Sequence, residues 1–481
     1  MRMDFSDFDN DLPEGPGSEG RDEKLRRFRR ALAEGKESLD IPNPDLLEEL
    51  VEQCIEDNAL EEGLRYCEQW TVFSPYNYVA WLRTAMILTG LERADEALVA
   101  IDRAESLNPN DIEIRIQRGI AHHTLGHDRE AVEILEEGLR QDPRNLELLF
   151  NYGLALQSVD RTEDALGVFR LIVGHPDYSV DCWYEIGYCL DILEQYDEAI
   201  AAYDRHLDLD PYNANAWYNK GIAQSRLGML RRGIDSYEMA LTINEEFEDA
   251  WYNKGNNLAA LGRLSAAIDC YKEVLRRDPD DASSWNNLGI ALEEAQRYDE
   301  AIEAFTRALE HEPDHYGAQI GLGASLDALD RFDEALAAYE KAGALRRDDP
   351  ELWLAKGDLL FSMGRQEEAI DCYTEAMTLA PLDAEPWVAL GQAYFTIGIY
   401  ADALRAFEHA CTIDAEWSRA QYGRACSLIS LQREEEALEP LRKAFTLHPE
   451  LTASFRADFP DAHDLYDRAI AVTDPDVPPS I

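Results

Sequence analysis

Apolar residues recur along this chain at helical spacing, and the helical segments themselves recur every 34 residues. The stretch Trp217–Gly221 reads WYNKG, the same letters return at Trp251–Gly255, and WNNLG follows at Trp285–Gly289. Within such a segment, apolar positions three and four residues apart share one face of an α-helix. A fixed period of this length is typical of a stacked array of two-helix repeats rather than of one globular core.

The 34-residue register extends from Pro44 to Leu451 with no insertion or deletion, which makes twelve repeats. The fourth position holds tryptophan in seven repeats, and the eighth holds glycine in nine consecutive repeats, Gly119 to Gly391. These positions share one face of a first helix, where glycine lets a neighbouring helix approach. Alanine at the twentieth position, in ten repeats, belongs to the matching stripe of a second helix, and a proline at the thirty-second, in eight repeats, ends that helix. We therefore predict two antiparallel helices of about fourteen residues in each repeat.

The consensus of these repeats reads W-x2-L/K-G-x2-L/Y, followed by alanine, an aromatic residue, alanine and proline. This pattern resembles the tetratricopeptide repeat family over about 85% of the chain. The resemblance implies an all-α fold, a right-handed superhelical α-solenoid of stacked antiparallel helix pairs. The first and last repeats depart from the consensus as caps do, with Leu47 and Val51 in the first and Gln421 and Ala425 in the last.

The segments that flank the repeats differ from them in composition, and together they divide the chain into five parts. We predict a disordered acidic N-terminus at 1–20, a basic amphipathic capping helix and linker at 21–43, twelve tandem repeats at 44–451, a C-terminal capping helix at 452–472 and a disordered tail at 473–481. The basic helix carries an apolar stripe of Leu25, Phe28 and Leu32. It has two interpretations, a cap on the first repeat or an arm that binds the acidic array or another anionic partner.

The charge of the chain bears on its partners. With 96 acidic and 45 basic side chains, the formal net charge is −51, which disfavours nucleic acid and anionic membranes as partners and favours basic ones. Heavy acidity with only eight lysines is also typical of a halophilic source, and a GC-rich genome would favour arginine in the same way. The chain has no apolar run of transmembrane length, and its eight cysteines form no CxxC pair, so we expect a cytoplasmic protein.

No catalytic motif is present in the sequence. There is no phosphate-binding glycine loop, nucleophile elbow or zincin motif, and carboxylate pairs such as Glu293–Glu294 have the composition of solvated faces. The best metal candidate is His122, His123 and His127, but His127 falls at the turn between two helices, which favours a solvated cluster over a site. We expect no enzyme activity, no cofactor and no metal.

The resemblance implies that positions two, five, nine and twelve of each first helix face a concave groove. Positions five, six and nine of repeats four to eight then supply the predicted binding residues, namely Phe150, Asn151, Tyr184, Tyr188, Tyr218, Asn219, Tyr252, Asn253, Asn256, Asn286 and Asn287. Aromatic rings offer contact area, and asparagine can bond to both peptide N–H and C=O, so this set suits an extended chain. The alternative is that the same residues support helix packing.

These observations favour a protein-interaction scaffold or adaptor that binds an extended, neutral or basic polypeptide segment. The family also has a lysine and arginine clamp for acidic chain ends, but position five holds no lysine here and position two only one basic residue, Arg419. The alternative is a non-catalytic regulatory or targeting subunit of a separately encoded enzyme. Self-association remains open.

Overall fold

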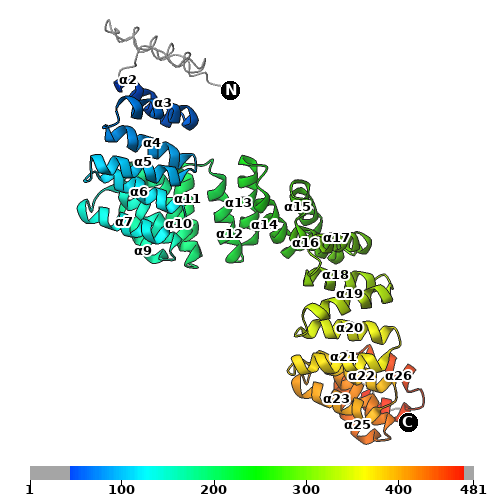
Figure 1. Cartoon of the computed structure of the whole chain (residues 1–481). Helices are drawn as coiled ribbons and strands as arrows, with labels where there is room; N and C mark the ends of the chain where they lie inside the picture. The colour runs from blue at the N-terminus through cyan, green and yellow to red at the C-terminus, as the bar shows by residue number, and fades with distance from the viewer. Residues whose placement is uncertain (1–43, 471–481) are drawn as a thin grey trace, which may run out of the picture. The chain divides into compact units, whose positions relative to one another are not determined.

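The computed structural model describes residues 44–470, which contain twenty-six α-helices and no β-strand (Figure 1). The basic helix predicted at 21–43 and the two predicted disordered ends, at 1–20 and 473–481, lie outside the described residues. The helices group into two compact units, which we call the N-terminal unit (44–229) and the C-terminal unit (230–470). No helix of the described part is long and apolar enough to cross a membrane.

The N-terminal unit is built from helices joined in sequence by short turns. They are α2 (Pro44–Glu56), α3 (Leu60–Phe73), α4 (Tyr78–Gly90), α5 (Ala94–Leu107), α6 (Ile112–Thr124), α7 (Asp128–Gln141), α8 (Leu146–Ser158), α9 (Thr162–Ile172), α10 (Pro176–Ile192), α11 (Tyr196–Leu209) and α12 (Ala214–Arg226).

The C-terminal unit continues the same alternation. Its helices are α13 (Leu230–Ile243), α14 (Glu248–Ala260), α15 (Leu264–Arg277), α16 (Ala282–Glu294), α17 (Tyr298–His311), α18 (Tyr316–Asp327), α19 (Phe332–Leu345), α20 (Pro350–Ser362), α21 (Gln366–Leu379), α22 (Ala384–Thr396), α23 (Tyr400–Ile413), α24 (Ser418–Ser430), α25 (Glu434–Leu447), α26 (Leu451–Asp458) and α27 (His463–Ile470). Within each unit, from α2 to α12 and from α13 to α25, each helix packs against its neighbours in sequence, which confirms the predicted stack of antiparallel helix pairs.

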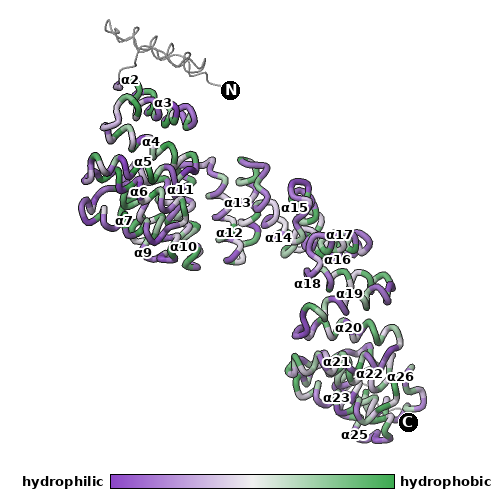
Figure 2. Tube along the Cα trace, in the orientation of Figure 1, coloured by the Kyte–Doolittle hydropathy of each residue, from purple (hydrophilic) through white to green (hydrophobic). Residues whose placement is uncertain are grey.

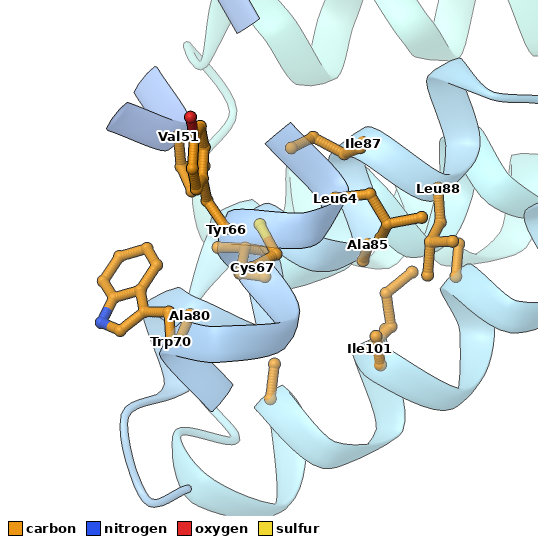
Figure 3. Close-up of a cluster of buried hydrophobic side chains, with 14 of the residues drawn as sticks. Val51, Leu64, Tyr66, Cys67, Trp70, Ala80, Ala85, Ile87, Leu88 and Ile101 are labelled. Carbon is orange, nitrogen blue, oxygen red and sulfur yellow. The ribbon is translucent and has the colours of Figure 1, made fainter. Parts of the chain in front are cut away.

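In eight repeats the core includes a contact between the glycine at position eight and the side chain at position 24. A Cβ added to Gly187, Gly255 or Gly289 would come within 2.6–2.8 Å of the ring of Tyr203, Tyr271 or Phe305, respectively. The alanines predicted at position 20 are fully buried. Figure 2 shows hydrophobic and hydrophilic stretches alternating along the helices, as amphipathic packing requires. Figure 3 shows the core of the first two repeats, where Val51 and Ala85 hold position eight and Cys67 and Ile101 are buried.

Two further columns of the repeat emerge from the structure. Asparagine or aspartate at position 34 caps the next first helix, as when Asn77 Oδ1 accepts from the Val79 N–H at 2.9 Å and Asp111 Oδ1 from the Glu113 N–H at 2.9 Å. Position 15 has a positive φ in every repeat, from 53° at Asn58 to 80° at Gly398. This left-handed residue follows each first helix and reverses the chain into the second helix.

The seven tryptophans at position four are half-buried, and five of them donate a hydrogen bond to the turn that precedes their repeat. The indole N–H of Trp217 donates to the Pro211 carbonyl at 3.0 Å, and that of Trp285 to the Pro279 carbonyl at 2.8 Å. In the last repeat Gln421 replaces tryptophan, and its Nε2 donates to the carbonyl of Ala415 at 2.9 Å, again six residues earlier. The sequence predicted inward packing of the ring but did not predict this hydrogen bond.

The C-terminal end of the array is covered by two short helices, α26 and α27, in the segment where the sequence predicts one capping helix. Phe455, Leu465 and Ala469 are buried in a cluster with Leu441 and Phe445 of α25. These contacts remove the apolar surface of the last repeat from water.

Candidate functional site

In the N-terminal unit, the predicted binding residues lie on α8, α10 and α12. Asn219 Nδ2 donates to the hydroxyl of Tyr184 at 3.0 Å and so links two consecutive repeats. The Tyr184 ring packs against Tyr203, with ring centroids 6.0 Å apart, and against His206 at 5.5 Å. Tyr188 is 43% exposed, whereas Tyr218 is half-buried.

The first two members of the predicted set are held by the fold itself. Phe150 lies edge-on to Phe169, with centroids 5.7 Å apart, and against Tyr178 at 5.6 Å. Asn151 Nδ2 donates to the carbonyl of Glu147 one turn earlier at 2.9 Å. Both side chains therefore contribute to helix packing, whatever else they contact.

In the C-terminal unit the predicted residues form one hydrogen-bonded group on α14 and α16. Asn287 Nδ2 donates to the hydroxyl of Tyr252 at 2.9 Å and to Asn256 Oδ1 at 3.2 Å. Asn256 Oδ1 also accepts from the Tyr271 hydroxyl at 2.9 Å. Asn286 is buried, with Nδ2 donating to Asn287 Oδ1 at 3.2 Å, and its own Oδ1 is buried without a partner.

The same link therefore recurs in both units, with an asparagine at position six bonded to a tyrosine at position five of the preceding repeat. The pairs are Asn219–Tyr184 and Asn287–Tyr252, each separated by 35 residues. Asn253, at position six of the seventh repeat, is half-buried. These bonds support the packing interpretation of the predicted set, and binding by its exposed edges stays a prediction.

The sequence analysis did not predict that several carboxylates on the same first helices are half-buried. In the N-terminal unit, burial raises the pKa of Glu147, Glu185 and Asp191 above their usual range. Glu185 accepts one hydrogen bond, from Gln157 Nε2 at 2.9 Å, and Asp191 pairs with Arg226 at 3.0 Å. Negative charge held in partial burial attracts a cationic group more strongly than charge in open water.

The C-terminal unit carries half-buried carboxylates on α16 and α18, Glu293 and Asp327, and an exposed one, Asp358, on α20. Burial, with a smaller effect of neighbouring Glu294, raises the pKa of Glu293 to about 7, and burial also raises the pKa of Asp327 and Asp358. The interpretation of Glu293 as part of a solvated face is therefore wrong, because packing of the neighbouring helices half-buries its side chain. The one signal in the sequence for this partial burial is that Glu293 and Asp327 both stand at position twelve of their repeats.

Replacing Glu293 with glutamine will stabilise the C-terminal unit at pH 8 by about 1 kcal/mol, a value that allows for partial exposure of the group. The folded protein holds the Glu293 proton more tightly than the unfolded chain, whose pKa lies near the ordinary value of 4.5. The wild-type carboxyl therefore contributes most below pH 4.5, and this contribution is lost as the pH rises through about 7.

Urea denaturation between pH 5 and pH 8 measures this effect. The gain from glutamine will be large at pH 8 and small at pH 5, whereas the same change at Glu303, which is exposed on α17, will have little effect at either pH. A gain at Glu293 that is equal at both values would show that burial of charge is not its cause.

The lysines of the first helices pair with acidic residues on the second helix of the preceding repeat. Position seven holds Lys220, whose Nζ pairs with Asp204 at 2.6 Å and lies 4.6 Å from the centroid of the Trp217 ring. Lys254 repeats the arrangement, 3.0 Å from Glu238 and 5.2 Å from the Trp251 ring. Each pair joins a repeat to the second helix of the one before it, so these lysines act between repeats.

Of the three histidines, two have rings close to each other and the third contacts an aspartate. The rings of His122 and His127 lie 5.8 Å apart, and His123 Nδ1 is 2.7 Å from Asp128 Oδ1. Burial lowers the pKa of His122, which favours its neutral form. Within residues 44–470, no group of three or more His, Cys, Asp or Glu side chains is arranged to hold a metal ion.

Comparison with known proteins assigns the repeats. Five family models, four described as tetratricopeptide repeat and one as TPR repeat, match residues 180–213, 214–247, 252–310, 292–359, 357–398 and 384–416. Three of these six segments begin at predicted repeat boundaries, 180, 214 and 384. A search of curated proteins finds no match.

Among solved structures, YrrB, described as a TPR protein with an unusual peptide-binding site, is 22% identical, with 39% of this chain and 96% of that chain covered and a TM-score of 0.35. A tetratricopeptide repeat protein from Parabacteroides merdae is 19% identical, with 52% and 99% covered and a TM-score of 0.42. The Cut9–Hcn1 hetero-tetramer of the APC/C is 14% identical, with 89% and 96% covered and a TM-score of 0.42. Similarities at this level carry no conclusion about what the present chain binds.

Proposed function

Because the chain belongs to the tetratricopeptide repeat family, we propose that it is a non-enzymatic scaffold that binds an extended, neutral or basic polypeptide segment along the first helices of its repeats. The observation that carries the proposal is the recurrence of half-buried carboxylates and tyrosines on these helices. Glu147 and Glu185 mark this surface in the N-terminal unit, and Glu293 and Asp327 mark it in the C-terminal unit.

The charge of this surface selects the class of ligand. Desolvated carboxylates destabilise the protein that holds them, and a bound lysine or arginine relieves the cost. The lysines of position seven are paired with acids of the preceding repeat, and position five holds no lysine for an acidic chain end. A basic segment therefore suits these helices better than an acidic one.

Replacing Glu147, Glu185 and Glu293 together with glutamine will weaken binding and raise stability in the same protein. Each partly exposed charge pair contributes about 0.2–1 kcal/mol, so the N-terminal unit, which loses two carboxylates, will bind its ligand about tenfold more weakly. The melting temperature will rise because three desolvated charges are removed. The control variant changes three exposed glutamates on second helices, Glu133, Glu163 and Glu303, to glutamine.

Affinity purification with mass spectrometry supplies the ligand for this test. Overlapping 15-residue peptides of the copurifying proteins are arrayed, and binding of the wild-type, triple and control proteins is compared. Loss of binding to basic peptides in the triple variant alone supports the proposal, and undiminished binding would contradict it. If an enzyme copurifies in stoichiometric amount and none of its peptides binds the chain, a role as its regulatory or targeting subunit would be favoured instead.

A further inference from the structure

The C-terminal unit has a hollow that the predicted binding residues do not include. Its volume is about 370 Å³, within the range of about 300–1,000 Å³ typical of pockets that enclose a ligand. It spans α20, α22 and α24, and its lining includes Leu354, Asp358, Glu385, Val388, Ala389 and Arg419. These side chains occupy positions two, five, six and nine of their repeats, the register of the predicted groove residues.

The apolar floor of the hollow follows from a change in the repeats. Position six is asparagine or glutamate in repeats four to eight, but glycine or alanine in repeats nine to twelve, at Gly321, Ala355, Ala389 and Gly423. Position five becomes aliphatic at Leu354 and Val388. A Cβ on Gly423 would come within 2.4 Å of the Phe407 ring, so α24, which carries Gly423, packs directly against that ring. The amides that link repeats in the earlier part of the array are thus replaced by an apolar surface.

Carboxylates flank the floor on the side of α20 and α22. Asp358 of α20 is exposed and accepts a hydrogen bond from the Tyr373 hydroxyl at 2.7 Å, and Glu385 is exposed at the start of α22. Asp327 of α18 extends the acidic side towards the preceding repeat. Arg419 of α24, on the opposite side of α22, is the one cation among the residues that line the hollow.

We infer that this hollow anchors a partner segment through a bulky apolar side chain, leucine, methionine or an aromatic residue, next to a lysine or arginine that pairs with Asp358 and Glu385. The inference rests on the proposed function and specifies which side chains of the ligand the C-terminal unit recognises. The apolar floor takes the side chain out of water, and the two carboxylates select its basic neighbour by charge. Burial of one such side chain corresponds to about ten- to hundredfold in affinity.

A random dodecapeptide phage library, panned on the full chain, tests this inference. The enriched peptides will share a bulky apolar residue adjacent to lysine or arginine. Their affinities for two variants are then measured by fluorescence anisotropy. Ala389→Leu fills the hollow and Glu385→Arg reverses its charge, and each will weaken binding at least tenfold. The matched controls Ala401→Leu and Glu375→Arg, exposed on second helices, will leave binding unchanged, and melting temperatures verify that all four variants fold.

The outcomes separate the inference from the proposed function. If peptides bind the chain but keep their affinity within twofold in both variants, the inference about the hollow is wrong and the proposed scaffold function still stands. Enriched peptides without an adjacent basic residue would overturn the charge selection. No enrichment at all would count against both proposals. If the shared motif is enriched only on a chain that lacks residues 1–43, then the chain's own Phe28 and its flanking arginines compete for the hollow, which overturns the assignment to a separate partner.

Discussion

Replacing Phe305 with alanine will lower the free energy of unfolding of the C-terminal unit by about 3–5 kcal/mol. Phe305 is fully buried, and its ring lies against two glycines of successive first helices. A Cβ on Gly289 would come within 2.6 Å of the ring, and one on Gly321 within 2.2 Å. Truncation leaves a cavity where α16, α17 and α18 meet, and the neighbouring glycines have no side chain to fill it. Urea denaturation followed by circular dichroism measures the loss.

A double-mutant cycle tests the cause of this effect. Gly289→Ala alone will destabilise the unit by about 1–3 kcal/mol through overpacking, despite the better helix propensity of alanine. Phe305→Leu replaces the ring with a smaller side chain that leaves room for the methyl group of the alanine. The double variant will therefore lose less stability than the two single variants added together. The last repeat carries this combination naturally, with Ala425 at position eight and Leu441 at position 24. Strictly additive costs would show that the ring does not rest on the glycine.

Replacing Trp251 with alanine will cost about 2–4 kcal/mol, the second largest expected effect. The half-buried indole donates its N–H to the Glu245 carbonyl at 2.9 Å, and Arg277 lies 5.9 Å from the ring centroid. Arg277 in turn pairs with Glu246 at 3.0 Å and Glu273 at 2.8 Å. The ring therefore supports a group of charges at the junction of two repeats, and its removal loosens all of them.

Two further substitutions at Trp251 divide this effect into its parts. Phenylalanine keeps most of the packing but loses the indole donor, at a cost of about 1 kcal/mol or slightly more. Glutamine keeps a donor, as Gln421 does in the last repeat, but loses the ring. If packing dominates, the glutamine variant will be the less stable of the two in thermal unfolding. The reverse order would make the bond to the preceding turn the principal contribution.

The sequence alone predicted what depends on the repeat period. Four residue columns in one phase indicate two helices in every repeat, and the helices follow that register from Pro44 to Leu447. Local departures have local causes. In the fourth repeat, α9 ends at Ile172 and α10 begins early, at Pro176, because proline suits the first turn of a helix and cannot lie inside one.

The tertiary structure decided how the side chains of each first helix are used. Tyr184 and Asn219 are 35 residues apart, so their hydrogen bond depends on how one repeat lies on the next. Glu293 likewise interacts with a residue of the next repeat, Tyr339 of α19, whose pKa is raised mainly by burial and further by this carboxylate. The hollow across α20, α22 and α24 has the same origin, since three repeats form it and none contains it.

The sequence by itself thus determined the repeated helix pair, because helical period, glycine at position eight and alanine at position 20 act within a single repeat. Only the tertiary structure decided which inner residues bond to each other, which carboxylates lose water and where an apolar hollow opens. The physical reason is that burial and hydrogen bonding depend on the distances between repeats. A linear pattern repeated every 34 residues carries no direct record of those distances.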